Sequence, residues 1–186
     1  AEAAAGLQDS GLQATAMVAD VTVEGAPDDI VNGALGEFGR LDILVNNAGV
    51  FVWKDLFDLD YEDWDRTIST NLSAPFHLTR IAGKTMAGQG SGGSIVNIAS
   101  IHAQVGDPNV IPHCASKFGL VGLTKATADA LREHEIRVNA IAPGAIDSNS
   151  LDRRGAGPSQ KVTQADIASL AVYLVSDLAR AVTGSV

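Results

Sequence analysis

Two residues, His113 and Lys117, have the types and the spacing for acid–base chemistry. Side chains four residues apart share one face of a helix, so the imidazole and the ammonium group would lie close together. Histidine is the commonest general acid or base in enzymes and titrates near neutrality. A neighbouring ammonium group should lower the pKa of His113 and favour the neutral ring, which can still accept a proton from an alcohol.

A second candidate site is the segment Asn47, Ala48 and Gly49, which follows a continuous apolar strand predicted at 41–46. In a doubly wound sheet, ligands bind in the crevice outside the carboxyl ends of the strands. Small residues at that place let a ribose or an adenine approach the backbone. Asparagine and glycine are also common in ordinary turns, so the segment taken alone leaves both interpretations open.

Two further polar residues lie at positions where chemistry is plausible. Asn71 lies inside a long predicted helix at 60–87, where an asparagine is locally unfavourable. Ser100 ends a predicted strand, thirteen residues before His113. An exposed helix face and a simple strand end are the structural alternatives for these two residues.

The elements that must position these residues alternate between helix and strand, as in a parallel α/β sheet. Strands are predicted at 13–18, 41–46, 94–99 and 136–141, with a further strand beginning at 183–186. Helices are predicted at 1–9, 27–38, 60–87, 112–133 and 164–176, and a polar loop at 147–161. No repeat or linker divides the chain, so we predict one domain over residues 1–186.

In this order and at these intervals, the motifs resemble those of the short-chain dehydrogenase/reductase family over essentially the whole chain. Asn46-Asn47-Ala48-Gly49 resembles the family's N-N-A-G motif, and His113 and Lys117 stand where the family has a Tyr-x-x-x-Lys pair. The resemblance implies a Rossmann-like, doubly wound parallel sheet. It also implies hydride transfer between NAD or NADP and a carbonyl or alcohol substrate. The 3-oxoacyl-carrier-protein reductases and the sugar or polyol dehydrogenases are the most similar members.

The resemblance implies a role for each candidate residue. His113 would replace the tyrosine that acts as acid and base, Ser100 would hydrogen-bond the substrate oxygen, and Asn71 would help to hold a water-linked proton relay. Lys117 would bind the nicotinamide ribose. The other cofactor contacts would come from Asp20 and Val21 at the adenine, from Asn47, Ala48 and Gly49, and from Pro143 and Gly144 beside the nicotinamide, with Ser148 as the nearest substitute for the family's threonine.

The family's glycine-rich T-G-x-x-x-G-I-G turn, its first βαβ unit and the full last strand are not found among these 186 residues. The predicted sheet is therefore incomplete. Strand 13–18 loses its usual neighbours. Either it moves beside 41–46 in a four-stranded sheet, or the edge of 41–46 stays exposed and invites association. We expect the first, because unpaired buried backbone groups are costly.

Composition narrows the partners and the compartment. Thirteen basic and 22 acidic residues give a net charge of −9, which argues against nucleic acid or an anionic membrane as a partner. One cysteine and no apolar run of bilayer length indicate a cytoplasmic protein. No metal site is expected, and His102 and His134 are assigned to the surface. In the family that the chain resembles, helices 60–87 and 112–133 build a dimer face, so a homo-oligomer is expected.

Two functions remain open at this point. The first is an NAD(P)-dependent oxidoreductase acting on a small carbonyl or alcohol. The second is a truncated, catalytically impaired relative that acts as a fragment or an interaction module. The histidine at position 113 and the missing glycine-rich turn favour the second for activity, and saturable dinucleotide binding would distinguish the two.

Overall fold

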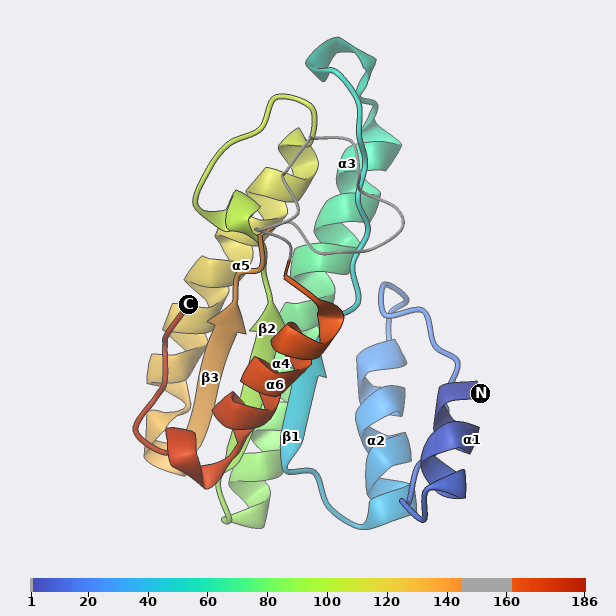
Figure 1. Ribbon diagram of the computed structural model, residues 1–186, viewed down its shortest axis with the longest axis vertical. Helices are drawn as coiled ribbons and strands as arrows, with labels where there is room; N and C mark the ends of the chain where they lie inside the picture. Colours follow the sequence, from blue (N-terminus) through green and yellow to red (C-terminus); the bar gives the residue numbers. More distant parts are fainter. Residues whose placement is uncertain (1, 145–161) are drawn as a thin grey trace.

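The computed structural model describes residues 2–144 and 162–186. Within them, three parallel strands form one sheet in the order β1 (Ile43–Asn46), β2 (Gly93–Ile98) and β3 (Ile136–Ile141) (Figure 1). Asn46 lies opposite Asn97, and Ile98 lies opposite Ile141. The carboxyl ends of all three parallel strands therefore lie together at one end of the sheet. The predicted α/β class with a Rossmann-like parallel sheet is confirmed.

Helices account for most of the remaining described residues. The α-helices are α1 (Glu2–Asp9), α2 (Ala26–Phe38), α3 (Tyr61–Ile68), α4 (Ala74–Gln89), α5 (Ile111–Ala130) and α6 (Gln164–Val175). Short 3-10 helices are η1 (Leu56–Asp58), η3 (Ile101–Ala103), η4 (Arg132–His134) and η6 (Asp177–Ala179). Across residues 2–144 and 162–186, no helix combines the length and the apolar character needed to cross a bilayer.

The sheet is the middle of three layers. Helices α4 and α5 cover one face and α6 covers the other, while α2 lies beside the β1 edge (Figure 1). Side chains alternate between the two cores, as expected for strands buried on both faces. Ile95 packs with Met86 of α4, whereas its neighbour Val96 packs with Leu174 of α6. The two cores fix the strand ends that carry the candidate residues.

The predicted helix at 60–87 is two helices, α3 and α4, joined by a π-helical turn, η2 (Ser69–Ser73). Pro75 lies in the first turn of α4. Because proline has no N–H, it cannot donate to the carbonyl of Asn71 four residues earlier, and the wider turn accommodates the missing bond. Such turns are frequent at functional sites. Asn71 lies within this one.

Residues 13–18 do not form the predicted strand, and the expectation of a fourth strand beside β1 is wrong. The segment is almost entirely exposed, and the side chain of Met17 lies over Gly33 of α2. This contact holds the segment against the helix instead of against the sheet. Within the described part of the chain, β1 pairs with β2 alone, and its residues Ile43 and Val45 are each 45% exposed.

The opposite edge of the sheet is lined by the last residues of the chain. The N–H of Gly184 donates to the carbonyl of Val138 at 2.8 Å, and the N–H of Ala140 donates to the carbonyl of Ser185 at 2.8 Å. These two bonds hold the final residues beside β3, but the structure assigns no strand to residues 183–186. The strand predicted to begin there is therefore not found among the described residues.

Candidate functional site

A buried polar row marks the carboxyl end of the sheet. The amide of Asn46 donates to Asn97 Oδ1 at 2.8 Å, and the amide of Asn97 donates to Thr124 Oγ1 at 2.8 Å. The row links β1, β2 and α5 directly beneath the candidate residues. Sequence analysis missed Asn97 and Thr124, although an asparagine inside the apolar strand at 94–99 was a visible signal.

Lys117 extends from α5 to the end of β2. Its Nζ donates to the carbonyl of Ile98 at 2.6 Å, and the residue is 6% exposed. Burial lowers the pKa of Lys117 to about 8. A methyl group placed on Gly49 would lie 4.0 Å from this Nζ and 3.3 Å from Asn71 Oδ1. The structure thus brings together three residues, Gly49, Asn71 and Lys117, that the sequence placed far apart.

The side chain of Asn71 is completely buried and serves as a bridge. Its Oδ1 accepts from the N–H of Val50 at 2.8 Å, and its Nδ2 donates to the carbonyl of Val50 at 2.9 Å. The same Nδ2 lies 3.2 Å from Ser116 Oγ, which in turn donates to the carbonyl of His113 at 2.8 Å. Asn71 therefore connects the loop after β1 to the helix that carries His113. Its part in a proton relay remains a prediction.

His113 is 9% exposed in the first turn of α5. The ring of Phe51 meets it edge-on at a centroid distance of 4.9 Å. Burial lowers the pKa of His113 to about 4, and repulsion from Lys117 and then His102 adds to the effect. The sequence predicted the direction of this shift, but it named the lysine as the cause where burial is the larger one.

His102 was assigned to the surface, and that assignment is wrong. Its side chain is 16% exposed, and its ring lies 5.6 Å from the ring of His113. The reason is the short helix η3, which turns the chain back over α5 immediately after β2. His134 is exposed, as predicted.

Ser100 and Pro143 lie side by side at the ends of β2 and β3. Ser100 caps η3, with Oγ accepting from the N–H of His102 at 3.2 Å. The N–H of Ile101 donates to the carbonyl of Pro143 at 2.8 Å, which ties the two loops together. Gly144 follows and is exposed. Ser148 and the predicted loop at 147–161 lie outside the described residues.

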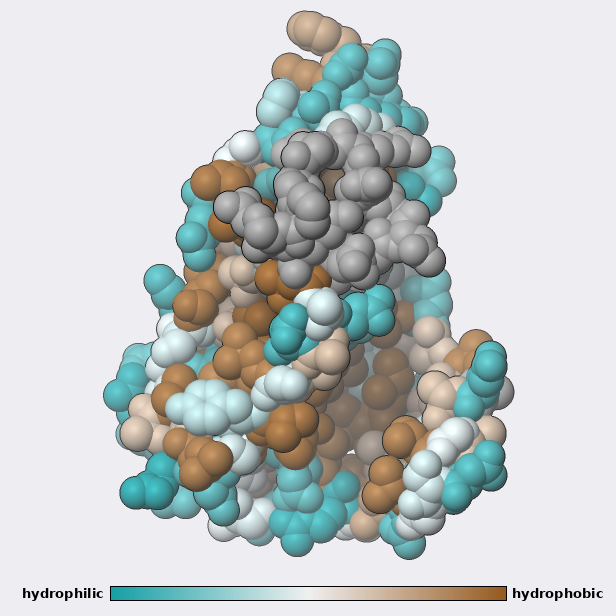
Figure 2. Space-filling view, in the orientation of Figure 1, coloured by the Kyte–Doolittle hydropathy of each residue, from teal (hydrophilic) through white to brown (hydrophobic). Residues whose placement is uncertain are grey.

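An apolar cavity of about 190 Å³ lies between α2, β1 and α4. It includes the backbone segment Asn47–Ala48 and the side chain of Val21, and Figure 2 shows an apolar hollow beside α2. Asp20 lies next to it, where its Oδ1 accepts from the N–H of Thr22 at 2.9 Å and from the Thr22 hydroxyl at 2.7 Å. These bonds lower the pKa of Asp20. The predicted adenine-side residues therefore gather on one side of the β1 end.

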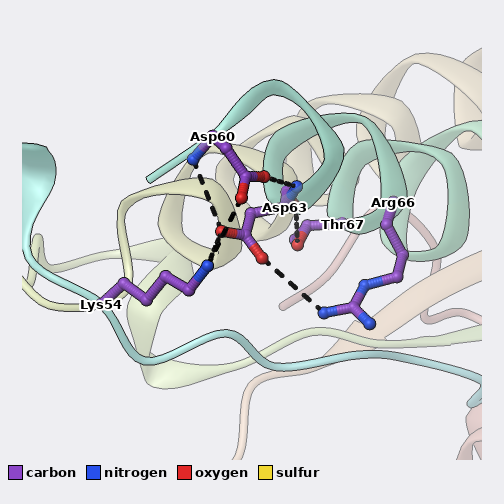
Figure 3. Close-up of polar contacts among 5 residues, drawn as sticks. All are labelled: Lys54, Asp60, Asp63, Arg66 and Thr67. Atoms are coloured by element: carbon purple, nitrogen blue, oxygen red, sulfur yellow. Dashed lines mark hydrogen bonds and ion pairs between the residues drawn. The ribbon is translucent and has the colours of Figure 1, made fainter. Parts of the chain in front are cut away.

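A group of charges fixes the segment that follows the N-N-A-G motif. Figure 3 shows Lys54 paired with Asp63 and lying 3.6 Å from Asp60, at the start of α3. The side chain of Asp63 is 10% exposed and lies 3.9 Å from Arg66. The Lys54 pair holds the pKa of Asp63 below its usual value. Sequence analysis missed this pair, because nothing in the spacing joins position 54 to 63.

No group of three or more histidine, cysteine or carboxylate side chains suited to a metal ion occurs in the described ranges. The polar atoms at the edge of the sheet are amides, hydroxyls, one ammonium group and imidazoles. Such a set can bind the hydroxyl groups of a sugar and move a proton at an oxygen atom.

The sequence matches the family described as enoyl-(acyl carrier protein) reductase over residues 1–186. A 3-oxoacyl-[acyl-carrier-protein] reductase of Staphylococcus aureus is 35% identical over 184 residues, covering 94% of this chain and 74% of that protein. A solved structure of a putative short-chain alcohol dehydrogenase from Sinorhizobium meliloti has a TM-score of 0.91 and 37% identity. It covers 99% of this chain and 77% of that one.

A second solved structure, an acetoin dehydrogenase from Salmonella typhimurium, has a TM-score of 0.88 and 32% identity over the same shares of the two chains, 99% and 77%. Sequence similarity over nearly the whole of this chain, a common fold and the order of the motifs agree. The chain belongs to the short-chain dehydrogenase/reductase family.

Proposed function

We propose that the chain is an NAD(P)-dependent oxidoreductase that transfers hydride between a nicotinamide cofactor and a carbonyl or alcohol substrate. The observation that carries this proposal is the buried ammonium group of Lys117, which lies beside Gly49 and Asn71 at the carboxyl edge of the sheet. Burial of a lysine is costly unless polar partners offset it. The hydroxyl groups of a nicotinamide ribose would be such partners.

The described residues fit a dinucleotide at both ends. The apolar cavity at Val21 suits an adenine ring, and Gly49 lies close to Asn71 and Lys117, whose ammonium group suits the hydroxyl groups of a ribose. When bound, the nicotinamide supplies or accepts the hydride. The residues that would hold the cofactor are Asp20, Val21, Asn47, Ala48, Gly49, Lys117, Pro143 and Gly144.

The residues of the chain would manage the proton and the orientation of the substrate. The neutral ring of His113 can give an N–H proton to a ketone oxygen or accept a proton from an alcohol. Ser100 can donate its hydroxyl proton to the same oxygen. Lys117 keeps a positive charge next to His113 and so favours the neutral ring. Phe51 closes one side of the imidazole against water.

A second candidate function is that of a catalytically impaired relative acting as an interaction module. Among the described residues β1 pairs only with β2, and this free edge, with Ile43 and Val45 exposed, favours the second function because such an edge is a template for pairing with another chain. We further propose self-association through helices α3 to α5, and a reducing, cytoplasmic compartment in keeping with the single free thiol, Cys114.

Titration of the purified chain with NADH and with NADPH tests the proposal, with energy transfer from Trp53 and Trp64 as the signal. Saturable binding supports the oxidoreductase, and preference for one nucleotide identifies the cofactor. If a chain that is folded by circular dichroism binds no nucleotide at millimolar concentration, the result supports the second candidate function, the interaction module. His113→Tyr then reports on chemistry: hydride transfer should rise in this variant if the imidazole is the weaker acid–base group.

A further inference from the structure

A second imidazole, that of His102, lies at the site beside a buried carboxylate. Nε2 of His102 lies 3.5 Å from Oδ2 of Asp107, and the two side chains are 16% and 3% exposed. A carboxylate next to one ring nitrogen orients the ring and determines which nitrogen carries the proton. His102 and Asp107 thus lie at ion-pair distance, and we call them the dyad.

The dyad is fixed by loops that converge from three parts of the chain. Asp107 Oδ1 accepts from the N–H of Asn109 at 3.0 Å, and the carbonyl of Asn109 accepts from the N–H of Lys54 at 3.0 Å. Ser100 caps the short helix that carries His102. Hydrogen bonds of Lys54, Asn109 and Ser100 therefore fix the position of the dyad.

The ring of His102 meets the ring of His113 at 5.6 Å between centroids and at an interplanar angle of 85°. Nδ1 of His113 is buried and has no hydrogen-bond partner in the part of the chain that the structure describes. A buried polar atom of this kind is where an ordered water is expected. One water between the rings would give a continuous path from Asp107 through His102 to His113.

We infer that His102, oriented by Asp107, is the residue that exchanges protons with His113 during turnover. This inference rests on the proposed function. In ketone reduction, one nitrogen of His113 gives its proton to the substrate oxygen, so that an N–H bond breaks and an O–H bond forms. The other nitrogen of His113 takes a proton, through the water, from protonated His102.

The exchange leaves the charges balanced. The anionic substrate oxygen becomes a hydroxyl, His102 changes from imidazolium to imidazole, and His113 is neutral before and after with its proton on the other nitrogen. His102 regains a proton from solvent through its exposed part, and Asp107 remains a carboxylate throughout. Alcohol oxidation follows the same path in reverse.

The charges around His113 explain why a relay is needed. Lys117 on its own helix and His102 on η3 face the ring, while Phe51 and the backbone of Val50 are uncharged. With a pKa of about 4, His113 holds no extra proton at neutral pH. Each proton that it delivers must therefore be replaced from a neighbour. His102 is a positioning and relay residue in this scheme, since it acts through His113.

The first test requires no cofactor. The ring nitrogens of His113 are followed by ¹⁵N NMR as the pH is changed. His102→Gln is expected to move the titration midpoint of His113 upward, because the repulsion from His102 is lost, and Asp107→Asn is expected to change the tautomer ratio of the His102 ring. His134→Gln, at an exposed histidine, is the matched control and should change neither. An unaltered His113 titration in His102→Gln, with an unaltered tautomer ratio in Asp107→Asn, overturns the inference.

The second test uses hydride transfer. His102→Gln and Asp107→Asn should each lower kcat by about ten- to a hundredfold with little change in KM, and the double variant should be no slower than His102→Gln. In a His113→Tyr background the His102→Gln effect should fall below about twofold, because the tyrosine ring lacks the Nδ1 atom that would take the proton from His102. Equal losses in both backgrounds would assign the dyad a purely structural role. Absence of turnover in the unmodified chain would count against the proposed function, while the NMR result decides whether the two imidazoles are coupled.

Discussion

Asn71 satisfies both backbone polar groups of Val50, accepting from its N–H at 2.8 Å and donating to its carbonyl at 2.9 Å. The asparagine lies in the π-helical turn before α4, and Val50 directly follows the N-N-A-G motif. The side chain of Asn71 thus makes the two backbone hydrogen bonds that a neighbouring strand would otherwise make to this loop. The same amide reaches Ser116 on α5, so three elements meet at one residue.

We expect Asn71→Asp to lower the free energy of unfolding by about 1–3 kcal/mol, because the carboxylate loses the two amide protons and leaves the Val50 carbonyl unpaired. Urea unfolding followed by circular dichroism measures the change. Asn47→Asp is the matched control, since Asn47 is exposed and its substitution should change stability by less than about 0.5 kcal/mol. Similar losses in both variants would contradict a bridging role for Asn71.

The close approach of Gly49 to Asn71 and Lys117 predicts an effect on cofactor binding. In Gly49→Ala the new methyl group would lie 3.3 Å from Asn71 Oδ1 and 4.0 Å from Lys117 Nζ, the ammonium group proposed to bind the ribose. We expect the dissociation constant for NADH or NADPH to rise about tenfold, a change of about 1.4 kcal/mol.

Gly36→Ala in helix α2 is the control for that substitution. A methyl group at Gly36 meets nothing within 4 Å, and alanine is the better helix former. The variant should gain about 0.5–1 kcal/mol of stability and bind the nucleotide unchanged. If Gly49→Ala binds the nucleotide as tightly as the unmodified chain, Gly49 does not contribute to the cofactor site.

The sequence predicted the strands at 41–46, 94–99 and 136–141 and most helices, because their apolar runs and glycine stops act locally. Residues 13–18 have the composition of a strand, yet a strand needs a partner, and Met17 binds α2 instead. No local pattern carries that information. The π-helical turn was also missed, although Pro75, which lacks the donor for the carbonyl of Asn71, was its visible cause.

The placement of Gly49 and Ser100 near the ends of strands was predictable, because the strands before them are read from local apolar runs. The site was not predictable where a contact joins two loops. His102 was placed on the surface because nothing in its neighbourhood shows that η3 folds back over α5, and the partners Lys54 and Asp63 come from separate segments. Long-range contacts of this kind depend on the packing of the whole sheet.

Stability should depend on pH through His113. Its pKa is about 4 in the folded chain and about 6.5 when unfolded, so the unfolded chain binds more protons between these values. The folded state is therefore favoured above pH 6.5, and this contribution is lost as the pH falls from 6.5 through 4. We expect a loss of roughly 1–2 kcal/mol over this window, after allowance for partial exposure to solvent.

The comparison of two variants isolates that contribution from the carboxylates that titrate in the same range. Urea midpoints at pH 7, 6, 5 and 4 should fall less steeply in His113→Gln than in the unmodified chain. His134→Gln should follow the unmodified chain, because His134 is exposed. Parallel curves for all three proteins would show that His113 keeps an ordinary pKa, and the need for a relay through His102 would disappear with it.

Two exposed aromatic side chains lie on the helices through which we propose self-association. Phe76 on α4 is 44% exposed and Phe118 on α5 is 48% exposed. Aromatic residues at the centre of an interface carry much of its binding energy. We expect Phe118→Asp to weaken self-association by about tenfold or more in sedimentation velocity, because a buried carboxylate without a partner is costly.

Phe57→Asp is the matched control, since Phe57 is 96% exposed in η1 and lies outside both helices. If Phe57→Asp dissociates the protein and Phe118→Asp does not, the interface lies elsewhere, and the unpaired edge of β1 becomes the next surface to test through Val45→Lys.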